Sequence, residues 1–354
     1  MIEICFFRKE FCIAMKANLL KKIGITVLLT LVMLLLLVYS VIGVVMLGPS
    51  EYASRLLVTT LMETSAAKFV PRLYMSAEAV DAIIGKEEEA TDLTVEKALI
   101  KLPEKTQLTP DDPGTVPADT DTDTDGIEIF DVKGATFYGK MMVIDDPTRV
   151  FVGIPKDGFG EGKSGMTVHA MIEHYDAIAG TNAGGFYDPN GNGTGGIPDG
   201  IVIYEGKLLW GNLGSYYSLA GIDGDGLLHV GRMTAQTAMD RGIQYAASYG
   251  PALIVNGTPQ NEKRALGGGL NPRTAIGQRE DGAILLLVVN GRSVDSLGAT
   301  LDDLVEVFLE YGAVNATNLD GGSSSLMIYE GENVTHSAYV YGERVVATSI
   351  LVKK

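Results

Sequence analysis

The sequence predicts an α+β fold, a single mixed-sheet domain with a few helices, preceded by an N-terminal transmembrane helix and a stalk. Three observations lead to this prediction. A long uncharged apolar run lies near the N-terminus, an amphipathic stretch follows it, and the C-terminal part alternates short β-rich runs with glycine-rich turns. With 354 residues, the chain is long enough for one large domain or two modest ones.

The apolar run extends from Ile23 to Leu47 and contains no charged residue. As a helix rising about 1.5 Å per residue, it would reach roughly 37 Å, enough to cross a hydrocarbon core of about 30 Å with some tilt. A cleavable signal peptide has a shorter apolar core, on the order of 7–15 residues, and then a small-residue cleavage site. We therefore expect residues 23–47 to be an uncleaved membrane anchor.

Flanking charges predict the orientation of this anchor. Residues 1–22 carry a cluster of basic side chains, namely Arg8, Lys9, Lys16, Lys21 and Lys22. The stretch just beyond the span offers only Arg55 and Lys68. Because basic residues stay on the cytoplasmic side, we expect a single-pass protein of the cell membrane with residues 1–22 in the cytoplasm and the C-terminal domain outside.

The cysteines agree with this placement. Cys5 and Cys12 are the only two in the chain, so a disulfide-built scaffold is excluded and the exported part has no cysteine. A cysteine-free exported domain of this size is ordinary in a Gram-positive bacterium, where we place the chain. The sequence leaves open whether translation starts at Met1 or Met15.

Two segments separate the span from the main domain. Residues 48–101 show apolar positions at mixed three- and four-residue spacing, which predicts a helical stalk, part of an oligomer, or a spacer packed on the main domain. Residues 102–126 contain four prolines and an alternating run of Asp and Thr that ends at Gly126. Low hydrophobicity and like charges predict an acidic disordered linker. Its spacing resembles the start of a calcium loop, but the twelfth position from Asp121 is Val132 instead of an acid.

Residues 127–354 form the predicted α+β domain. Helices are expected over 167–177 and 300–311. Strands are expected in five β-rich runs, namely 140–144, 201–204, 252–255, 284–289 and 345–352. The formal net charge of the chain is −16, which argues against a nucleic-acid partner because such a binder normally shows a basic face.

The densest candidate for chemistry is the glycine-rich segment 180–200. Asn182, Gly184 and Gly185 could bring backbone N–H groups close to a ligand, because glycine lets the chain approach without a Cβ clash; a tight structural turn is the alternative. Within it, four side chains fit the spacing of a calcium loop, namely Asp188, Asn190, Asn192 and Asp199. The closing residue is usually Glu, so a turn cluster is favoured over a calcium site.

Two further segments carry polar side chains at strand ends. Arg273 follows a proline and enters a strand, where its guanidinium can grip a phosphate through two parallel hydrogen bonds or pair with a carboxylate. Asp320 precedes Gly321 and Gly322, a turn that continues into hydroxyl side chains. Asp320 could act as acid or base, and Ser323 and Ser324 could donate to phosphate oxygens. No serine-nucleophile elbow, Walker loop or dinucleotide fingerprint is present.

Taken in order, these segments resemble the phosphodiester glycosidase family over residues 127–354. The resemblance rests on six pieces, namely 182–186 (NAGGF), 250–254 (GPALI), 273–277 (RTAIG), 289–292 (VNGR), 301–309 and 319–324 (LDGGSS). Two pieces depart from the family pattern, with Ala183 in the first and Ser323 in place of a glycine in the last. Both changes exchange small residues, so we expect the pocket to survive and the substrate preference to differ.

The resemblance implies hydrolysis of a sugar-1-phosphodiester by an outward-facing enzyme that needs no cofactor. Asp320 is the first candidate for the catalytic carboxylate and Asp188 the second. The implied substrate and phosphate contacts are Asn182, Gly184, Gly185, Phe186, Arg273, Thr274, Arg292, Gly321, Gly322, Ser323 and Ser324. The partner would be a phosphodiester-linked carbohydrate of the cell envelope, such as a teichoic acid or an exopolysaccharide.

Two other functions remain open from the sequence. A non-catalytic module that binds envelope glycan or assists exopolysaccharide assembly would keep the glycine loops and arginines without using the carboxylates. A transferase would move a sugar phosphate to an acceptor alcohol. The sequence does not identify the sugar, the stereochemical outcome or the oligomeric state.

Overall fold

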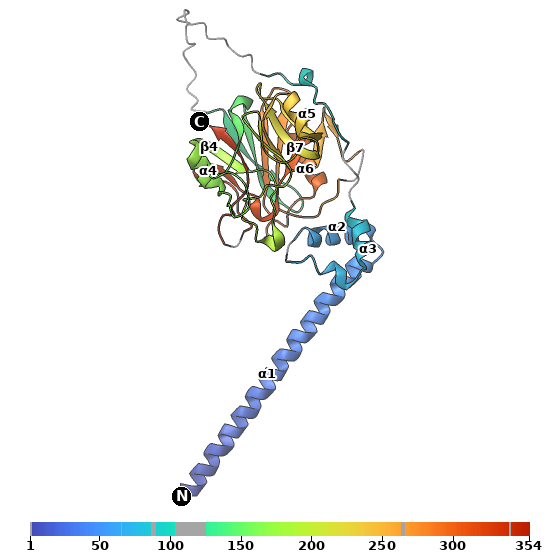
Figure 1. Ribbon diagram of the computed structural model, residues 1–354. Coiled ribbons are helices and arrows are strands. Elements are labelled where there is room, and N and C mark those ends of the chain that lie inside the picture. Colours follow the sequence, from blue (N-terminus) through green and yellow to red (C-terminus); the bar gives the residue numbers. More distant parts are fainter. Residues whose placement is uncertain (1, 65, 86–89, 103–124, 263–265, 340) are drawn as a thin grey trace, which may run out of the picture.

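The computed structural model of the chain describes all residues except 1, 65, 86–89, 103–124, 263–265 and 340. Most of the expected acidic linker, 102–126, therefore lies outside the described residues. A long helix, α1 (Ile2–Leu47), projects from a body of strands and short helices (Figure 1). Its stretch Asn18–Leu47 is long and apolar enough to cross a membrane, and none of its most apolar window is buried against the rest of the chain.

A small helical segment joins α1 to the body. It contains α2 (Glu51–Met62), the turn η1 (Pro71–Leu73) and α3 (Ala77–Ile84). Serines cap both α-helices, because the Ser50 and Ser76 side chains accept backbone N–H groups three residues on. This segment packs on the end of α1 through the buried side chains Met46, Val58 and Val80. The expected stalk is thus helical as far as Ile84.

The rest of the expected stalk belongs to the body of the protein. Residues 92–101 contain only the short turn η2 (Lys97–Leu99) and run along the strands. Val95 and Ile100 are buried in the central core, and Lys97 and Lys101 pair with Asp225 and Glu280. This stretch is held by burial as well as by surface ion pairs.

The α+β class is confirmed, but the strands form three antiparallel sheets where the sequence suggested one mixed sheet. The seven-stranded sheet has the order β1 (Ile127–Lys133), β2 (Tyr138–Ile144), β13 (Ile284–Val289), β12 (Arg273–Arg279), β14 (Ala313–Leu319), β10 (Ala252–Val255) and β11 (Thr258–Pro259). A five-stranded sheet has the order β16 (Glu332–Asn333), β15 (Met327–Tyr329), β4 (Ala177–Asn182), β17 (Ser349–Lys353) and β3 (Val150–Gly153). The other five-stranded sheet has the order β6 (Lys207–Trp210), β5 (Val202–Tyr204), β9 (Ile243–Ser248), β7 (Tyr216–Asp223) and β8 (Leu228–Thr234).

Strand β13 shows why more than one sheet is needed. All six of its residues are buried, and alternate residues join different hydrophobic clusters. Ile284, Leu286 and Val288 face the central core, whereas Leu285, Leu287 and Val289 face the cluster under α6. A continuous apolar strand of this kind must be covered on both faces. The other two sheets and α6 supply the cover.

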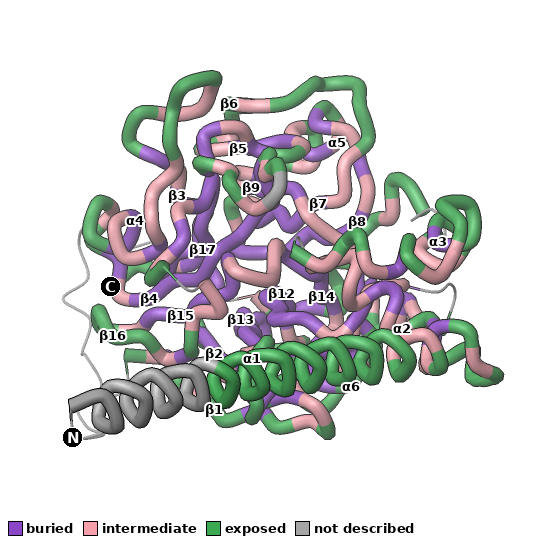
Figure 2. Tube along the Cα trace, turned by 90° about the horizontal axis from the view of Figure 1, so that it is seen from below, coloured by how far each residue is buried: buried purple, intermediate pink, exposed green. Residues whose placement is uncertain are grey.

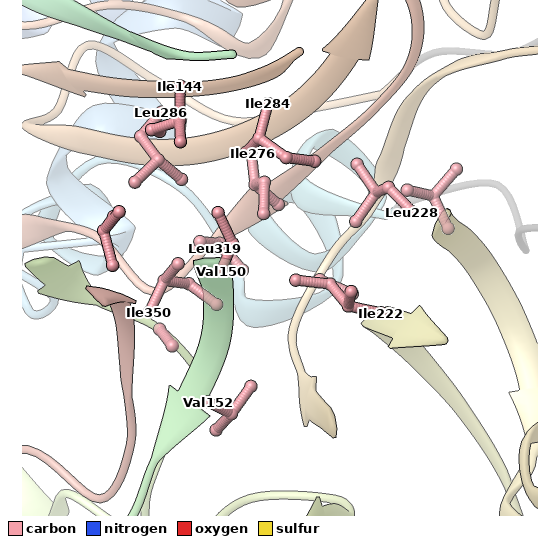
Figure 3. Packing of buried hydrophobic residues seen from close by; sticks show 14 of the residues in the cluster. Ile144, Val150, Val152, Ile222, Leu228, Ile276, Ile284, Leu286, Leu319 and Ile350 are labelled. Atoms are coloured by element: carbon pink, nitrogen blue, oxygen red, sulfur yellow. The ribbon is translucent and has the colours of Figure 1, made fainter. Parts of the chain in front are cut away.

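The central core lies where the three sheets meet. Side chains from the seven-stranded sheet, such as Leu286 and Leu319, meet Val150 and Ile350 from one five-stranded sheet and Ile222 from the other (Figure 3). Figure 2 shows the strands as the buried part of the body and α1 as exposed along most of its length, except near its end, where Met46 is buried.

Three helices cover the outer faces of the sheets. Helix α6 (Leu301–Glu310) begins at a capping box of Thr300 and Asp303 and packs on the seven-stranded sheet. Helix α4 (Val168–Tyr175) packs on the sheet that contains β4, and α5 (Ala235–Asp240) packs on the sheet that contains β9. The two helices expected from the sequence correspond to α4 and α6. Three further short turns complete the described elements, namely η3 (Pro147–Arg149), η4 (Pro189–Gly191) and η5 (Gly322–Ser324).

Candidate active site

A cavity of about 420 Å³ lies where the ends of β12 and β14 meet the glycine-rich segment and the N-terminal helical segment. We call its two sides the sheet wall and the N-terminal wall. The sheet wall contains Phe186, Asp188, Tyr249, Asn271, Arg273, Arg292, Asn318, Asp320, Gly321, Gly322, Ser323, Ser324 and Arg344. The N-terminal wall consists of Met62, Glu63 and Lys68.

The sheet wall is held together behind Asp320. The backbone N–H of Asp320 donates to the Ala183 carbonyl at 2.8 Å, and the Asn182 side-chain amide donates to the Asp320 carbonyl. The Thr274 hydroxyl donates to Asn182 Oδ1 at 2.8 Å. Asn182 belongs to β4, whereas Thr274 and Asp320 lie on or beside strands of the seven-stranded sheet. A fully buried amide thus joins two sheets directly behind the candidate carboxylate.

Asp320 has an unusual protonation equilibrium. Burial raises the pKa of its carboxyl to about 6, and the negative charge of Asp188 acts in the same direction. A hydrogen bond from Ser324 and the positive charge of Arg344 favour the ionised form and offset only part of this rise. A carboxyl that titrates near neutral pH is suited to proton transfer.

Asp188 and Arg344 form a charged pair in the cavity. Asp188 Oδ1 lies 2.6 Å from Arg344 Nη2 and also accepts the Gly193 N–H at 2.6 Å. Arg344 Nη1 donates to Ser323 Oγ at 2.6 Å, and its guanidinium lies 5.0 Å from the centre of the Phe186 ring. Arg344 therefore binds both the glycine-rich segment and the turn that follows Asp320.

The two predicted arginines differ in how they are used. Arg273 is buried and its Nη2 donates to Glu63 at 2.8 Å and to the Gly269 carbonyl at 2.7 Å, while its Nε donates to the Ala299 carbonyl. Arg292 is exposed at the rim and donates to Asn271 Oδ1 at 3.2 Å. Of the two, Arg292 keeps more donor capacity for an anion.

Gly322 lets Arg292 approach the turn after Asp320. Its φ is +63°, a conformation that favours glycine, and a Cβ there would lie 3.2 Å from Arg292 Nη2. The Gly322 N–H donates to the Pro272 carbonyl at 2.8 Å, which holds the turn against the start of β12. A side chain at this position would displace the guanidinium.

Not every residue expected from the sequence faces the cavity. Asn182 and Thr274 are fully buried behind it. The N–H groups of Gly184 and Gly185 are not offered to a ligand, because they donate to Thr348 Oγ1 at 2.9 Å and to the Ser248 carbonyl at 3.1 Å. Packing decides this, since Gly185 leaves room for the Tyr249 ring, 3.0 Å from where a Cβ would stand.

Both acids of the possible calcium loop have protein partners. Asp188 faces Arg344 and Gly193, and the Asp199 N–H pairs with the Gly185 carbonyl, whereas the Asn190 side chain lies outside the described part. Among the described residues, no group of three or more His, Cys, Asp or Glu could hold a metal ion.

Sequence reasoning missed Arg344 and Tyr249. Burial raises the pKa of the Tyr249 phenol, and the negative charge of Asp320 adds to this, so the side chain stays a neutral hydrogen-bond donor. Tyr249 directly precedes the Gly250–Pro251 piece of the family resemblance, which was the available signal. Arg344 lies outside all six pieces, so no local signal identified it.

The N-terminal wall was also missed. Glu63 Oε2 accepts from Arg273 at 2.8 Å and from Asn271 Nδ2 at 2.7 Å. The Leu270 N–H donates to Thr60 Oγ1 at 2.9 Å. The end of α2 therefore rests on the segment just before β12 and places a carboxylate beside the buried guanidinium.

The family model described as phosphodiester glycosidase matches residues 175–353, half of the chain. A protein of Bacillus subtilis strain 168, SPbeta prophage-derived uncharacterized protein YomE, is 32% identical over 175 residues, which are 48% of this chain and 27% of that protein. Mouse N-acetylglucosamine-1-phosphodiester alpha-N-acetylglucosaminidase is 25% identical over 219 residues, 56% of this chain and 41% of the mouse protein. The chain thus spans less than half the length of either relative.

A solved structure supports the fold. The catalytic domain of the zebrafish N-acetylglucosamine-1-phosphodiester alpha-N-acetylglucosaminidase, described as auto-inhibited by its pro-peptide, superposes with a TM-score of 0.55 at 21% identity. The match covers 66% of this chain and 85% of the zebrafish domain.

Proposed function

Because the chain belongs to the phosphodiester glycosidase family, we propose that it is a membrane-anchored extracellular hydrolase that cleaves a sugar-1-phosphodiester in a cell-envelope glycopolymer or glycan. The name of the mouse relative makes N-acetylglucosamine the first sugar to test. Catalysis is proposed because of the side chains in the cavity, and not because of family membership alone.

The observation that carries the proposal is the charge arrangement in the cavity. Arg273, Arg292, Arg344 and Lys68 face three carboxylates there, so cations exceed acids locally in a chain whose formal net charge is −16. A phosphodiester is an anion, and guanidinium groups suit its oxygens in both charge and geometry. Among them we assign the main phosphate contacts to Arg292 and Arg344.

Asp320 is the proposed catalytic carboxylate. In the proposed reaction, water bonds to the anomeric carbon, the bond from that carbon to the phosphate oxygen breaks, and the leaving group is a phosphate monoester. Ionised Asp320 accepts the proton of the attacking water, for which its pKa of about 6 is suitable. The phosphate carries the charge of the leaving group, so the arginines stabilise it where negative charge develops. We keep Asp188 as the second candidate, since it also lines the cavity.

The anchor is part of the proposal. The apolar part of α1 has a mean hydropathy of 2.8 and lies near the N-terminus, as a signal anchor or a signal peptide would. Packing favours the anchor, because Ser54 Oγ donates to the Met46 carbonyl at 2.7 Å and Met46 is 1% exposed. Removal of α1 would uncover the apolar side of α2. With basic residues at the N-terminal end, the domain would lie outside the cell.

The test uses the full chain purified in detergent. It is incubated with a panel of sugar-1-phosphodiesters that begins with the methyl diester of N-acetylglucosamine-1-phosphate, and free reducing sugar and phosphate monoester are measured together. Equal amounts of both products support hydrolysis. Retention on immobilised polymer without release of sugar would instead indicate a glycan-binding module, and transfer to an added alcohol would indicate a transferase.

A further inference from the structure

In the sequence, the first residues that line the cavity follow shortly after the outer end of the membrane span. Helix α1 ends at Leu47, α2 begins at Glu51, and the last residue of α2, Met62, already lines the cavity. A helix of 12 residues is roughly 18 Å long at about 1.5 Å per residue. With the short connection from Leu47 to Glu51 added, the N-terminal wall starts within roughly 30 Å of the end of the span, whichever way α2 points.

The joint between the span and this wall is packed. Ser54 bonds the Met46 carbonyl, and Met46, Val58 and Val80 are buried together. On the other side of the wall, Glu63 and Thr60 bond the segment that leads into β12. Both ends of α2 are thus fixed between α1 and the body of strands (Figure 1). The cavity is therefore held at a set height above the span.

A second contact joins the helical segment to α1 below its end. Tyr74 donates its hydroxyl to the Tyr39 carbonyl at 2.8 Å, and the two rings stack at 4.7 Å. Tyr39 lies about 12 Å below Leu47 along α1, at about 1.5 Å per residue. Tyrosine is enriched at the membrane–water interface. With Tyr39 and Tyr74 at that interface, the segment α2–α3 would overlap the headgroup layer instead of standing above it.

The surface of this segment fits that layer. Tyr52, Phe69 and Leu73 are 74%, 62% and 56% exposed, and the exposed bases Lys68 and Arg72 lie next to the last two. Exposed aromatic and aliphatic side chains beside basic ones suit the boundary between headgroups and acyl chains. Lys68 also lines the cavity, so a single short loop contacts both the interface and the site.

From this geometry we propose that the substrate is carried on a lipid of the same membrane: a sugar-1-phosphodiester whose second alcohol is a membrane lipid or a chain attached to one. The inference rests on the proposed function and names its substrate class. Phe69 and Leu73 enter the outer leaflet and keep the cavity at the level where the phosphodiester headgroup emerges. Confinement of enzyme and substrate to one surface then raises their effective concentration.

The experiment uses the full chain reconstituted in vesicles of phosphatidylcholine and phosphatidylglycerol. N-Acetylglucosamine-1-phosphate is offered as the diester of a dialkylglycerol in the same vesicles, as the same lipid in separate vesicles, and as the soluble methyl diester. Released sugar is measured at equal bulk concentration. We expect the lipid in the same vesicles to be cleaved at least tenfold faster than either other form. Equal rates for the soluble diester or for separate vesicles would overturn the inference and leave the proposed function intact, whereas no cleavage of any form would overturn both.

A matched pair of variants locates the effect. The double variant Phe69→Glu with Leu73→Glu should lose fivefold or more on the lipid diester and keep the wild-type rate on the methyl diester. The control Leu209→Glu places one such charge at an apolar side chain that is 43% exposed on β6, and both of its rates should stay unchanged. The rate on the methyl diester reports folding in each variant. Equal loss on both substrates in the double variant, or none on the lipid, would contradict the assignment.

Discussion

The two walls of the cavity differ in how they are fixed. In the sheet wall, the ends of β4, β12 and β14 are tied to one another by a buried amide, a buried hydroxyl and backbone hydrogen bonds. In the N-terminal wall, the end of α2 rests on that framework through Thr60 and Glu63. The comparison teaches that one wall provides a fixed place for chemistry, while the other can be changed without dismantling it.

The largest effect is expected at the centre of the sheet wall. Asp320→Asn keeps the shape of the side chain and removes its ability to accept a proton. We expect kcat on a sugar-1-phosphodiester to fall by roughly 10²–10⁴-fold, the usual contribution of a positioned acid or base. Glu332→Gln, an exposed acid on β16, is the control and should leave kcat unchanged. Wild-type turnover by Asp320→Asn would show that this carboxylate is not the base, and Asp188→Asn would then be the next test.

The rate should also depend on pH. Because Asp320 acts in its ionised form, kcat/KM should rise with pH through about 6, the pKa of the free enzyme's carboxyl. A pH profile of the wild type measured between pH 4 and 8 checks this. A rate that falls through the same range would assign Asp320 as an acid instead.

The raised pKa of Asp320 also predicts that stability falls with rising pH, whereas the rate rises. Its pKa is raised from 3.8 to about 6 in the folded protein, so the folded state binds its proton more tightly than the unfolded state. Its stabilising contribution is complete below pH 4 and is lost as pH rises to about 6. Above that pH, Asp320→Asn should be more stable than the wild type by about 3 kcal/mol, since one pKa unit corresponds to about 1.4 kcal/mol. Thermal unfolding of both forms at pH 4 and pH 8 measures the difference, which should nearly vanish at pH 4.

Loss of a hydrogen bond behind the Asp320 carboxylate should have a smaller effect than loss of the carboxylate itself. Thr274→Val removes the hydroxyl that donates to Asn182 Oδ1 and keeps the volume of the side chain. We expect a loss of about 1–3 kcal/mol in the free energy of unfolding, because a buried acceptor loses a partner. Thr258→Val on β11, a partly exposed threonine in the same sheet, serves as the matched control. An unchanged unfolding midpoint for Thr274→Val would show that the link between the sheets is not needed.

The smallest effect is expected in the N-terminal wall. Glu63→Gln removes a negative charge beside Arg273 and keeps an acceptor for its hydrogen bond. Inorganic phosphate should then bind the full chain about three- to tenfold more tightly, equivalent to roughly 1 kcal/mol of electrostatic repulsion. Calorimetric titration measures this, with Glu306→Gln on the exposed face of α6 as control. If phosphate affinity does not change, Glu63 does not oppose the anion in the cavity.

The sheet wall was largely accessible to sequence reasoning, whereas the N-terminal wall was not. Strands 252–255 and 284–289 and helix 300–311 follow from local apolar patterns, and Asp320 and Gly322 stand in a short polar turn after a strand. Local patterns do not tell how strands are divided among sheets, which is why three sheets were expected as one. Glu63 and Arg344 acquire their roles from partners far away in the chain, Arg273 and Asp188, and the sequence around them carries no trace of those contacts.

The burial of Met46 with Val58 and Val80 has a consequence for proteolytic release of the body from α1. Many exported domains can be freed by a single proteolytic cut in a loose tether. Here a cut just after Leu47 would remove the apolar cover from α2, and α2 carries the N-terminal wall of the cavity. The released fragment would therefore expose apolar surface next to a loosened cavity, so the proposed activity should be lower in the fragment than in the full chain.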